Sequence, residues 1–267
     1  MSPPARPLVR VVFCGTAGLY SALVLQRLLA CRDLEVVGLI RSTRVLRARF
    51  GFLRGAWHQI RISGVFYAAY LWMATDWTET LCRCSLGHLA RRHNLPTLTT
   101  RNVNDAAGLA FVTAAQPDVL VSCFFNQRIG DAVRRLPRRA AVNLHPSLLP
   151  AFKGVDPVFH ARLRQAPSLG VTIHHLTDRF DAGSILRQQA LPDVAADSLF
   201  MSTARLFDHG GCLLISLLRD GSDTQPGIPQ VSTDAYDSWP TAGQVRQLCR
   251  RGIALLRMRD LAWARRQ

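Results

Sequence analysis

The distribution of apolar and polar positions predicts strands and helices in alternation along most of the chain. Short apolar runs, typical of buried strands, alternate with segments whose leucines and alanines recur at helical spacing. The predicted strands are residues 8–14, 34–40, 95–98, 118–123, 140–144 and 169–175. The predicted helices are residues 20–30, 86–93, 109–115, 129–135, 198–218 and, after an aperiodic stretch, 245–265. This alternation is typical of an α/β domain that is doubly wound, with a mostly parallel sheet and helices on both faces.

A glycine turn at residues 15–18 connects the first predicted strand to the first predicted helix. A dinucleotide-binding loop occupies the same position in many α/β proteins. Here Gly-Thr-Ala-Gly lacks the G-x-G-x-x-G spacing, and no acidic residue follows the second strand. We therefore expect these glycines to close a tight turn rather than to bind a dinucleotide.

Residues 41–92 depart from the α/β alternation. Arginines are concentrated before an apolar run at residues 64–74. These arginines are Arg44, Arg47, Arg49 and Arg54. The run is too short to span a bilayer, which needs about 20 apolar residues. It could pack on the core, lie at a membrane surface, or line an apolar acceptor pocket, and packing on the core is the interpretation we favour.

The chain is strongly basic, with a net charge of +15 from 33 basic and 18 acidic residues. Such a charge attracts nucleic acids and anionic membrane surfaces. However, Lys153 is the one lysine among the basic residues, and the arginines are spread along the chain, which also fits a coding bias of a whole genome. We therefore do not expect a nucleic-acid partner, although the charge alone leaves that alternative open.

The cysteines are seven in number and form no CxxC pair. Cys82-x-Cys84 has no second pair that would complete a zinc site. The first nine residues contain three prolines and no hydrophobic stretch, so no secretory signal is predicted. Scattered cysteines without such a signal are typical of a reducing, cytoplasmic location. The sequence leaves the oligomeric state open.

Polar residues occur where an α/β sheet would bind a ligand. Asn143 and His145 alternate at the carboxyl end of a predicted strand, so their side chains share one face of it. Asp181 lies in a polar turn, residues 177–183, after a later strand. Ligands of open α/β sheets bind beyond the carboxyl ends of the strands. Taken singly, each of these residues could instead be an ordinary turn or core residue.

Two longer motifs contain these three residues. Residues 143–154 read Asn-Leu-His-Pro-Ser-Leu-Leu-Pro-Ala-Phe-Lys-Gly and resemble the signature of the folate-dependent formyltransferases. Residues 170–174, Gly-Val-Thr-Ile-His, and residues 177–183, Thr-Asp-Arg-Phe-Asp-Ala-Gly, resemble the second motif of that family. The resemblance covers roughly residues 8–220 and is strongest over residues 118–210.

The resemblance implies a Rossmann-like formyltransferase domain with N10-formyl-tetrahydrofolate as co-substrate. It places the family's catalytic residues on Asn143, His145 and Asp181. It places the binding of the folate carrier on Phe124, Phe125, Gln127, Arg128, Ile129, Thr177 and Asp178. At residues 124–126, Phe-Phe-Asn replaces the smaller residues common in relatives. It places acceptor binding on Ser147, Gly154 and His174, and for His174 a structural role is an equal alternative.

The three proposed catalytic residues suit the transfer of a formyl group to an amine. Attack of the nitrogen on the formyl carbon creates a tetrahedral oxyanion, which needs preorganised hydrogen-bond donors. The Asn143 amide and the His145 imidazole can supply such donors. Asp181 can take the proton that the nitrogen loses, directly or through a water, or it can tune His145. This chemistry requires no metal.

We predict that the acceptor is an amine of a small biosynthetic substrate, such as an amino-sugar. Enzymes of the family that act on initiator methionyl-tRNA carry a C-terminal β-barrel of about a hundred residues, comparable in scale to an OB module. Here a short basic extension, residues 221–267, follows the predicted catalytic domain at residues 8–220. Enzymes of the purine pathway lack an insertion like the atypical apolar and basic segment at residues 41–92. We expect residues 44–77 of that segment to help shape the acceptor pocket.

Other functions for such a chain are an initiator methionyl-tRNA formyltransferase, hydrolysis of the formyl carrier with water as acceptor, and a non-catalytic module that binds folate. Relatives that hydrolyse the carrier use the same three residues, and release of formate without an amine would distinguish them. An intact set of Asn143, His145 and Asp181 favours an enzyme over a binding module.

Overall fold

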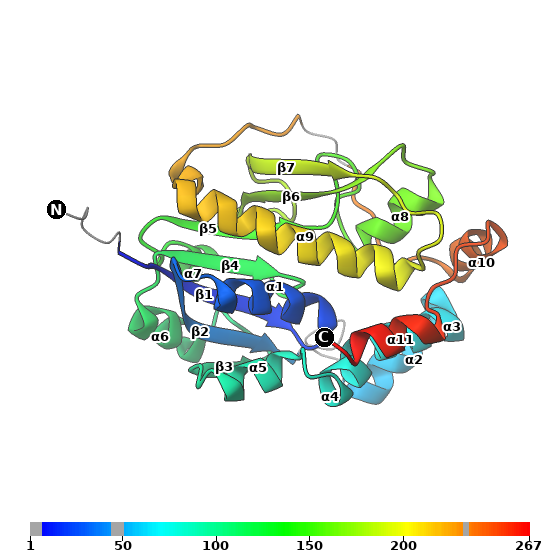
Figure 1. The fold of residues 1–267 in the computed structure, drawn as a ribbon, viewed down its shortest axis with the longest axis horizontal. Helices are drawn as coiled ribbons and strands as arrows, with labels where there is room; N and C mark the ends of the chain where they lie inside the picture. Colours follow the sequence, from blue (N-terminus) through cyan, green and yellow to red (C-terminus); the bar gives the residue numbers. More distant parts are fainter. Residues whose placement is uncertain (1–6, 44–50, 232–234) are drawn as a thin grey trace.

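A computed structural model describes residues 7–43, 51–231 and 235–267. Arg44, Arg47 and Arg49 of the predicted basic segment lie outside these ranges, as do residues 1–6 of the predicted N-terminal segment. Within the described residues, the sheet has seven strands in the order β3-β2-β1-β4-β5-β6-β7 (Figure 1). The strands are β1 Val9–Thr16, β2 Leu34–Ser42, β3 Thr97–Thr100, β4 Val119–Cys123, β5 Ala140–His145, β6 Leu169–His175 and β7 Ile185–Leu191.

The direction of the strands confirms a mostly parallel, Rossmann-like sheet. Strands β1 to β5 run parallel to one another, whereas β6 and β7 are antiparallel to their neighbours. From β1 the chain first builds outward through β2 and β3, and then returns to place β4 on the other side of β1. Such a reversal of strand order opens a crevice at the carboxyl ends of the strands, where ligands of this architecture bind.

Helices cover both faces of the sheet, as predicted. α1 Leu19–Ala30 and α9 Leu199–Asp220 pack on one face, and α6 Ala106–Ala115 and α7 Asp131–Arg134 pack on the other (Figure 1). The remaining described helices are α2 Phe52–Ser63, α3 Val65–Trp72, α4 Thr78–Leu81, α5 Leu86–Arg92, α8 Pro157–Leu163, α10 Ala242–Arg250 and α11 Met258–Ala264, with a π-helix at Met73–Trp77 and a 3-10 turn at Ser222–Thr224.

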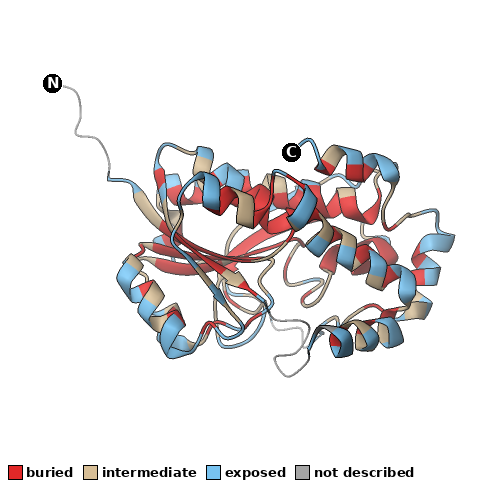
Figure 2. Cartoon of the chain, turned by 90° about the horizontal axis from the view of Figure 1, so that it is seen from below, coloured by how far each residue is buried: buried red, intermediate tan, exposed pale blue. Residues whose placement is uncertain are grey.

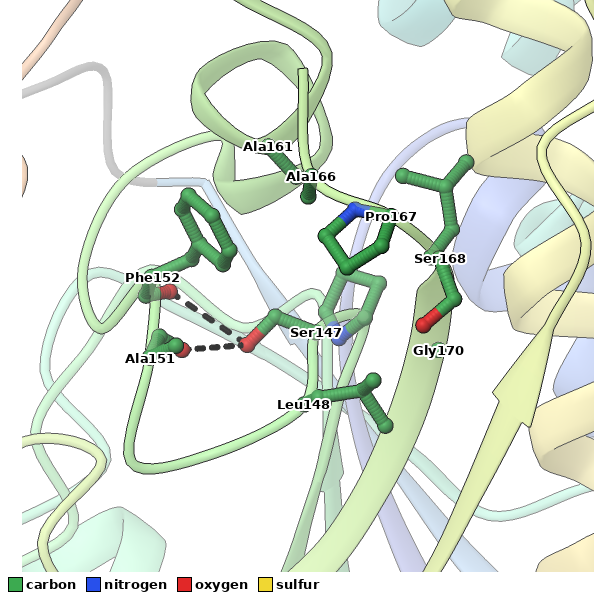
Figure 3. A pocket seen from close by; sticks show the side chains of 11 residues that line it. Ser147, Leu148, Ala151, Phe152, Ala161, Ala166, Pro167, Ser168 and Gly170 are labelled. Carbon is green, nitrogen blue, oxygen red and sulfur yellow. Dashed lines mark hydrogen bonds between the residues drawn. The ribbon is translucent and has the colours of Figure 1, made fainter. Parts of the chain in front are cut away.

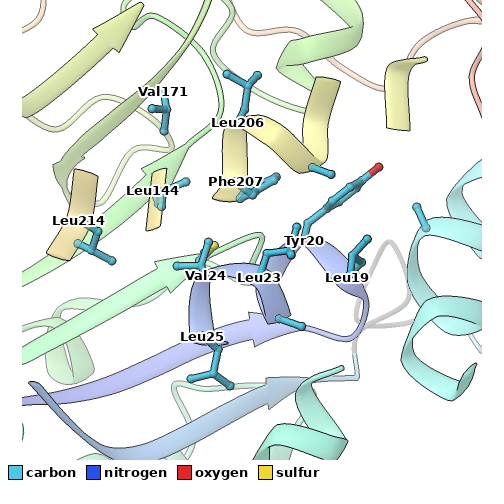
Figure 4. Close-up of a cluster of buried hydrophobic side chains, with 14 of the residues drawn as sticks. Leu19, Tyr20, Leu23, Val24, Leu25, Leu144, Val171, Leu206, Phe207 and Leu214 are labelled. Carbon is cyan, nitrogen blue, oxygen red and sulfur yellow. The ribbon is translucent and has the colours of Figure 1, made fainter. Parts of the chain in front are cut away.

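The core follows the two-residue period of the strands. In β1, Phe13 faces the larger apolar cluster beneath α1 and α9, while its neighbour Val12 faces the smaller cluster beneath α6 and α7. Figure 4 shows Tyr20 of α1 lying against Phe207 of α9, and their rings stack with centroids 5.5 Å apart. Each large side chain buried in this way contributes about 1.5–3 kcal/mol. In Figure 2 the buried residues accordingly concentrate in the strands and on the inner sides of the helices.

The glycine turn after β1 brings residues 73–79 against the start of α1. Gly18 has a φ of 125°, and a Cβ there would lie 2.7 Å from the carbonyl oxygen of Ala74, so this position requires glycine. The Glu79 carboxylate accepts a hydrogen bond from the Gly18 N–H (3.2 Å), and the Thr78 hydroxyl accepts one from the Leu19 N–H (3.1 Å). A dinucleotide site would use such free N–H groups for phosphate, whereas here side chains of the chain itself bind them.

The apolar run at residues 64–74 forms α3 and the beginning of the π-helix. On its inner side Tyr67 and Tyr70 are buried in the larger core cluster, which agrees with packing on the core. On its outer side Phe66 and Trp72 are exposed, which the core-packing interpretation does not explain. None of the helices within the described ranges has the length and hydropathy needed to cross a bilayer.

Several predicted element boundaries were wrong. The helix predicted at residues 245–265 is two helices, α10 and α11, because the chain turns at Gly252, where φ is 80°. The helix predicted at residues 129–135 is the single turn α7, Asp131–Arg134. The strand predicted at residues 95–98 is present as β3, but it begins two residues later, at Thr97–Thr100.

The segment after α9 packs back on the domain. The Leu199 N–H donates to the Ala254 carbonyl (2.8 Å) and the Phe200 N–H to that of Leu255 (3.0 Å), so this segment binds the first turn of α9. Leu248 of α10 is fully buried in the larger core cluster. The C-terminal helices are therefore part of the same packed unit as the sheet.

Candidate active site

Asn143 and His145 lie at the carboxyl end of β5, next to the antiparallel strand β6. Asn143 is opposite His174, and His145 is opposite Thr172. Because alternate residues of a strand share a face, this register places Asn143, His145 and His174 on the same side of the sheet. His145 and His174 are 4% and 1% exposed, so both imidazoles are shielded from bulk water.

His174 orients the Asn143 side chain. His174 Nδ1 donates to the carbonyl oxygen of His175 (2.8 Å), since a carbonyl can only accept. In the neutral ring Nε2 is then an acceptor, and it receives a hydrogen bond from Asn143 Nδ2 (3.1 Å). Burial lowers the pKa of His174 from its usual 6.5 to about 4, so the ring is neutral near pH 7. One hydrogen of the Asn143 amide is therefore fixed by His174, and the second is available to a ligand.

Asp181 approaches both histidines from the turn after β6. Its Oδ1 lies 3.4 Å from His145 Nδ1 and 3.8 Å from His174 Nε2. Its Oδ2 accepts a hydrogen bond from the N–H of Gly154 (2.9 Å). This bond connects the turn after β6 to the loop after β5 and holds the carboxylate in place. The turn depends on Gly183, where a Cβ would lie 1.7 Å from the carbonyl oxygen of His175.

The loop that follows β5 holds the other side of the His145 ring. His145 Nε2 donates to the carbonyl oxygen of Phe152 (3.1 Å), because that oxygen can only accept. Thr172 ties the start of the loop to β6 by donating to the Ser147 carbonyl (2.6 Å) and accepting from the Leu149 N–H (3.2 Å). The imidazole is thus held between a carbonyl oxygen and the Asp181 carboxylate.

The three residues predicted to bind the acceptor occupy different environments. His174 is hydrogen-bonded to Asn143, and the Gly154 N–H is hydrogen-bonded to Asp181. Ser147 is 3% exposed, and its hydroxyl donates to the carbonyls of Ala151 (3.1 Å) and Phe152 (3.4 Å), as Figure 3 shows. The Ser147 hydroxyl therefore stabilises the loop that follows β5 instead of facing a ligand.

A cavity of about 180 Å³ lies beside this loop (Figure 3). Its lining is mostly apolar and includes Phe152, Ala161, Pro167 and Gly170. Asn143, His145 and Asp181 do not line it. The cavity is therefore separate from the place where these three residues converge.

The residues predicted to bind the folate carrier divide into two groups. Four of them support the framework: Phe124 packs on Tyr20 and Phe207, Phe125 and Ile129 belong to the smaller core cluster, and Gln127 bonds Val103, Ser42 and Thr100. The others are more open. Arg128 Nη1 donates to the carbonyl oxygen of Asp178 (3.4 Å), and the Thr177 hydroxyl donates to that of Arg179 (2.9 Å). The loop after β4 and the turn after β6 therefore meet at Arg128.

A buried pair next to the loop that follows β5 was not predicted. Tyr67 of α3 donates its hydroxyl proton to Asp156 Oδ2 (2.6 Å), and Asp156 Oδ1 accepts from the Phe159 N–H at the start of α8 (3.3 Å). Burial raises the pKa of Asp156, and the Tyr67 hydrogen bond opposes that rise. Asp156 followed by Pro157 is a helix-start signal that the sequence carries, but its partner Tyr67 is 89 residues away.

Comparison with known proteins agrees with this architecture. Residues 86–218, which contain all three proposed catalytic residues, match the family model described as formyl transferase. A methionyl-tRNA formyltransferase of Halalkalibacterium halodurans is 30% identical over 125 residues, which are 47% of this chain and 39% of that protein. The chain thus matches less than half of the length of that relative.

Solved structures show the same fold at low sequence identity. Glycinamide ribonucleotide transformylase 1 from Symbiobacterium toebii superimposes with a TM-score of 0.57 at 16% identity, covering 84% of this chain and 95% of that one. WlaRD, a sugar 3N-formyl transferase solved in the presence of dTDP and 5-N-formyl-THF, gives a TM-score of 0.55 at 15% identity, covering 87% of this chain and 70% of that one. By the segment that matches the family model, the chain belongs to the formyltransferase family.

Proposed function

We propose that the chain transfers a formyl group from N10-formyl-tetrahydrofolate to an amine of a small biosynthetic substrate, such as an amino-sugar. The observation that carries this proposal is the convergence of three side chains on Asp181. His145 Nδ1 and His174 Nε2 lie 3.4 and 3.8 Å from the Asp181 carboxylate, and His174 is hydrogen-bonded to Asn143. This convergence joins an amide donor, an imidazole and a carboxylate at the carboxyl ends of the strands, which is where this architecture binds ligands.

In the proposed reaction, the amine nitrogen attacks the formyl carbon, and the carbonyl oxygen becomes an oxyanion. The free hydrogen of the Asn143 amide stabilises that oxygen, and His145 Nδ1, 3.4 Å from Asp181 Oδ1, positions the carboxylate. Asp181 takes the proton that the amine loses, directly or through a water. When the bond between the formyl carbon and N10 breaks, Asp181 returns this proton to N10, directly or through a water. Atoms and charges then balance without any further reactant.

The carrier is proposed to lie along the loop after β4 and the turn after β6. These segments meet at the hydrogen bond between Arg128 and the Asp178 carbonyl, beside Asp181. Phe124, Phe125, Gln127 and Ile129 then act by holding that loop in place, because their side chains are engaged in the framework. Carrier contacts would come from backbone groups of this loop and of residues 177–181.

A second candidate acceptor is initiator methionyl-tRNA. The match to a methionyl-tRNA formyltransferase at 30% identity and the net charge of +15 both favour it. The sugar 3N-formyl transferase WlaRD, which shares the fold over most of this chain, favours the amino-sugar.

A panel of acceptors tests the proposal. The purified chain is incubated with formyl-tetrahydrofolate and, in parallel, nucleotide-linked amino-sugars, glycinamide ribonucleotide, charged initiator tRNA, or no amine. We expect a formylated amino-sugar or a related small amine, detected by mass spectrometry. Formylation of the charged tRNA alone would refute the small acceptor, and formate release at the same rate without any amine would identify a hydrolase.

A further inference from the structure

Helix α2 has an inverted arrangement of polar and apolar side chains. Its inner side carries Gln59 and Ser63, which are 4% and 1% exposed and joined by a hydrogen bond of 2.8 Å. Its outer side carries Leu53 and Trp57, which are 81% and 64% exposed. A surface helix of a globular protein normally buries its apolar side and exposes its polar one. The outer side of α2 is therefore suited to an apolar surrounding rather than to water alone.

The following helix extends this apolar surface. Val65 and Phe66, at the start of α3, are 57% and 78% exposed, and Trp72 at its end is 48% exposed. α2 and α3 contact each other and lie at one end of the molecule (Figure 1). We call the exposed apolar side chains of these two helices the α2–α3 patch: Leu53, Trp57, Ile60, Val65, Phe66 and Trp72.

The exposed charge on α2 is positive. The helix exposes Arg54 and Arg61, and it contains no acidic residue. The first acidic residue after the patch is Asp76, which is exposed in the π-helix. Helix α10, which packs against α2, exposes Arg246 and Arg250. A surface that combines leucine, phenylalanine and tryptophan with arginine matches the interface of an anionic bilayer, where aromatic rings lie at the headgroups and arginines lie near the phosphates.

We propose that the α2–α3 patch docks the protein on an anionic lipid membrane surface. Both helices lie along the surface, since neither is long enough to span a bilayer. The apolar side chains enter the boundary between headgroups and acyl chains, and Arg54 and Arg61 bind lipid phosphates. This docking does not depend on the proposed formyl transfer, because it follows from the exposed residues alone.

The same helices are connected to the candidate active site. Tyr67, on the inner side of α3, is hydrogen-bonded to Asp156. Asp156 lies two residues after Gly154, whose N–H binds the Asp181 carboxylate. Docking through the outer side of α3 therefore places the loop that holds Asp181 directly behind the membrane-facing surface.

Co-sedimentation with lipid vesicles tests the proposal. Vesicles made of equal parts phosphatidylglycerol and phosphatidylcholine should bind the full chain, and vesicles of phosphatidylcholine alone should bind it much more weakly. Replacing Arg54 and Arg61 with glutamine should lower binding about 25-fold, since an arginine near an anionic surface contributes about fivefold. Replacing Leu53 and Trp57 with glutamine should lower binding at least about tenfold.

Matched variants elsewhere on the surface control for charge and hydrophobicity. Met258 is 80% exposed, so Met258→Gln changes an equally exposed apolar side chain outside the α2–α3 patch. The pair Arg135→Gln and Arg138→Gln removes the same charge near α7, away from α2 (Figure 1). Both controls should bind vesicles like the wild type, and all variants should show the same unfolding transition in urea.

Two results would overturn the proposal. One is equal sedimentation of the wild type with and without phosphatidylglycerol, or equal losses in the patch variants and their controls. The other is a wild-type dimer in gel filtration that Leu53→Gln with Trp57→Gln converts to a monomer, which would make the patch an interface between copies of the chain.

Discussion

Replacing His174 with leucine removes the group that orients the Asn143 amide while leaving Asn143, His145 and Asp181 in place. His174 Nε2 accepts a hydrogen bond from Asn143 Nδ2 at 3.1 Å, and leucine offers no acceptor there. The buried imidazole is also neutral near pH 7, because burial lowers its pKa to about 4. One substitution therefore gives two independent effects, one on turnover and one on the pH dependence of stability.

The effect on turnover follows from the position of the amide. Loss of a whole oxyanion donor lowers kcat by about 10²- to 10³-fold in well-studied cases. In the His174→Leu variant the donor remains but is free to rotate, so we expect a decrease in kcat of about 10- to 100-fold with little change in KM. Steady-state kinetics on the best acceptor from the panel measures both constants.

The effect on stability depends on which state binds more protons. Below its unfolded pKa of about 6.5 the unfolded chain protonates His174, while the folded chain does not until about pH 4. Acidification in this window therefore favours unfolding, and stability is lost as the pH falls. Between about pH 7 and about pH 5, protonation of His174 in the unfolded chain lowers the free energy of unfolding of the wild type by roughly 2 kcal/mol. The His174→Leu variant lacks this contribution. Urea unfolding of both proteins at the two pH values measures the difference.

His175→Leu is the matched control for this experiment. The His175 side chain donates to the carbonyl oxygen of Gln225 (2.8 Å), away from Asn143, and leucine preserves the backbone carbonyl that holds His174. We expect its kcat to stay within about threefold of the wild type, because successive residues of a strand face opposite sides of the sheet. Equal losses in kcat for the two leucine variants, or a pH dependence of stability unchanged in His174→Leu, would refute the orienting role.

Three further substitutions test other parts of the account. Asp181→Asn should lower kcat about 10²- to 10⁴-fold while urea unfolding stays cooperative, and unchanged turnover would contradict its role as proton acceptor. Tyr67→Phe removes the hydrogen bond of 2.6 Å to the buried Asp156 carboxylate and should lower the free energy of unfolding by about 1.5–3 kcal/mol, measured in urea. Gly183→Ala places a methyl group 1.7 Å from the His175 carbonyl oxygen and should destabilise the fold by about 3 kcal/mol; a smaller loss than Tyr67→Phe would show that the turn can shift.

The parallel half of the fold follows from local sequence patterns. β1, β2, β4 and β5 are mostly apolar runs, typical of strands buried on both faces. The strand β7 was not predicted, because it exposes polar residues such as Gln188 and Gln189 near the edge of the sheet and its hydrophobic alternation is weak. Helix α2 was missed for a different reason: its apolar side faces outward, so its pattern does not identify a core-facing surface.

The candidate site could be predicted in part. The two motifs name Asn143, His145 and Asp181. In the structure His145 lies against Asp181, and His174 connects Asn143 to the same carboxylate. Local sequence cannot reveal that Phe152 contributes a carbonyl oxygen to His145, since backbone groups carry no sequence signal. It also cannot separate the loop residues that face a ligand from those that hold the loop, as with Gln127, because that distinction depends on contacts between distant segments.

The most direct test of the central claim is the rate of tetrahydrofolate formation from N10-formyl-tetrahydrofolate in the presence of an amine, compared between the wild type and His145→Gln. Carrier binding is measured on the same samples by equilibrium dialysis. We predict that His145→Gln binds the carrier with nearly the wild-type Kd and loses turnover by at least about 10²-fold. Equal rates in the two proteins would contradict the assignment of formyl transfer to the group around Asn143, His145 and Asp181.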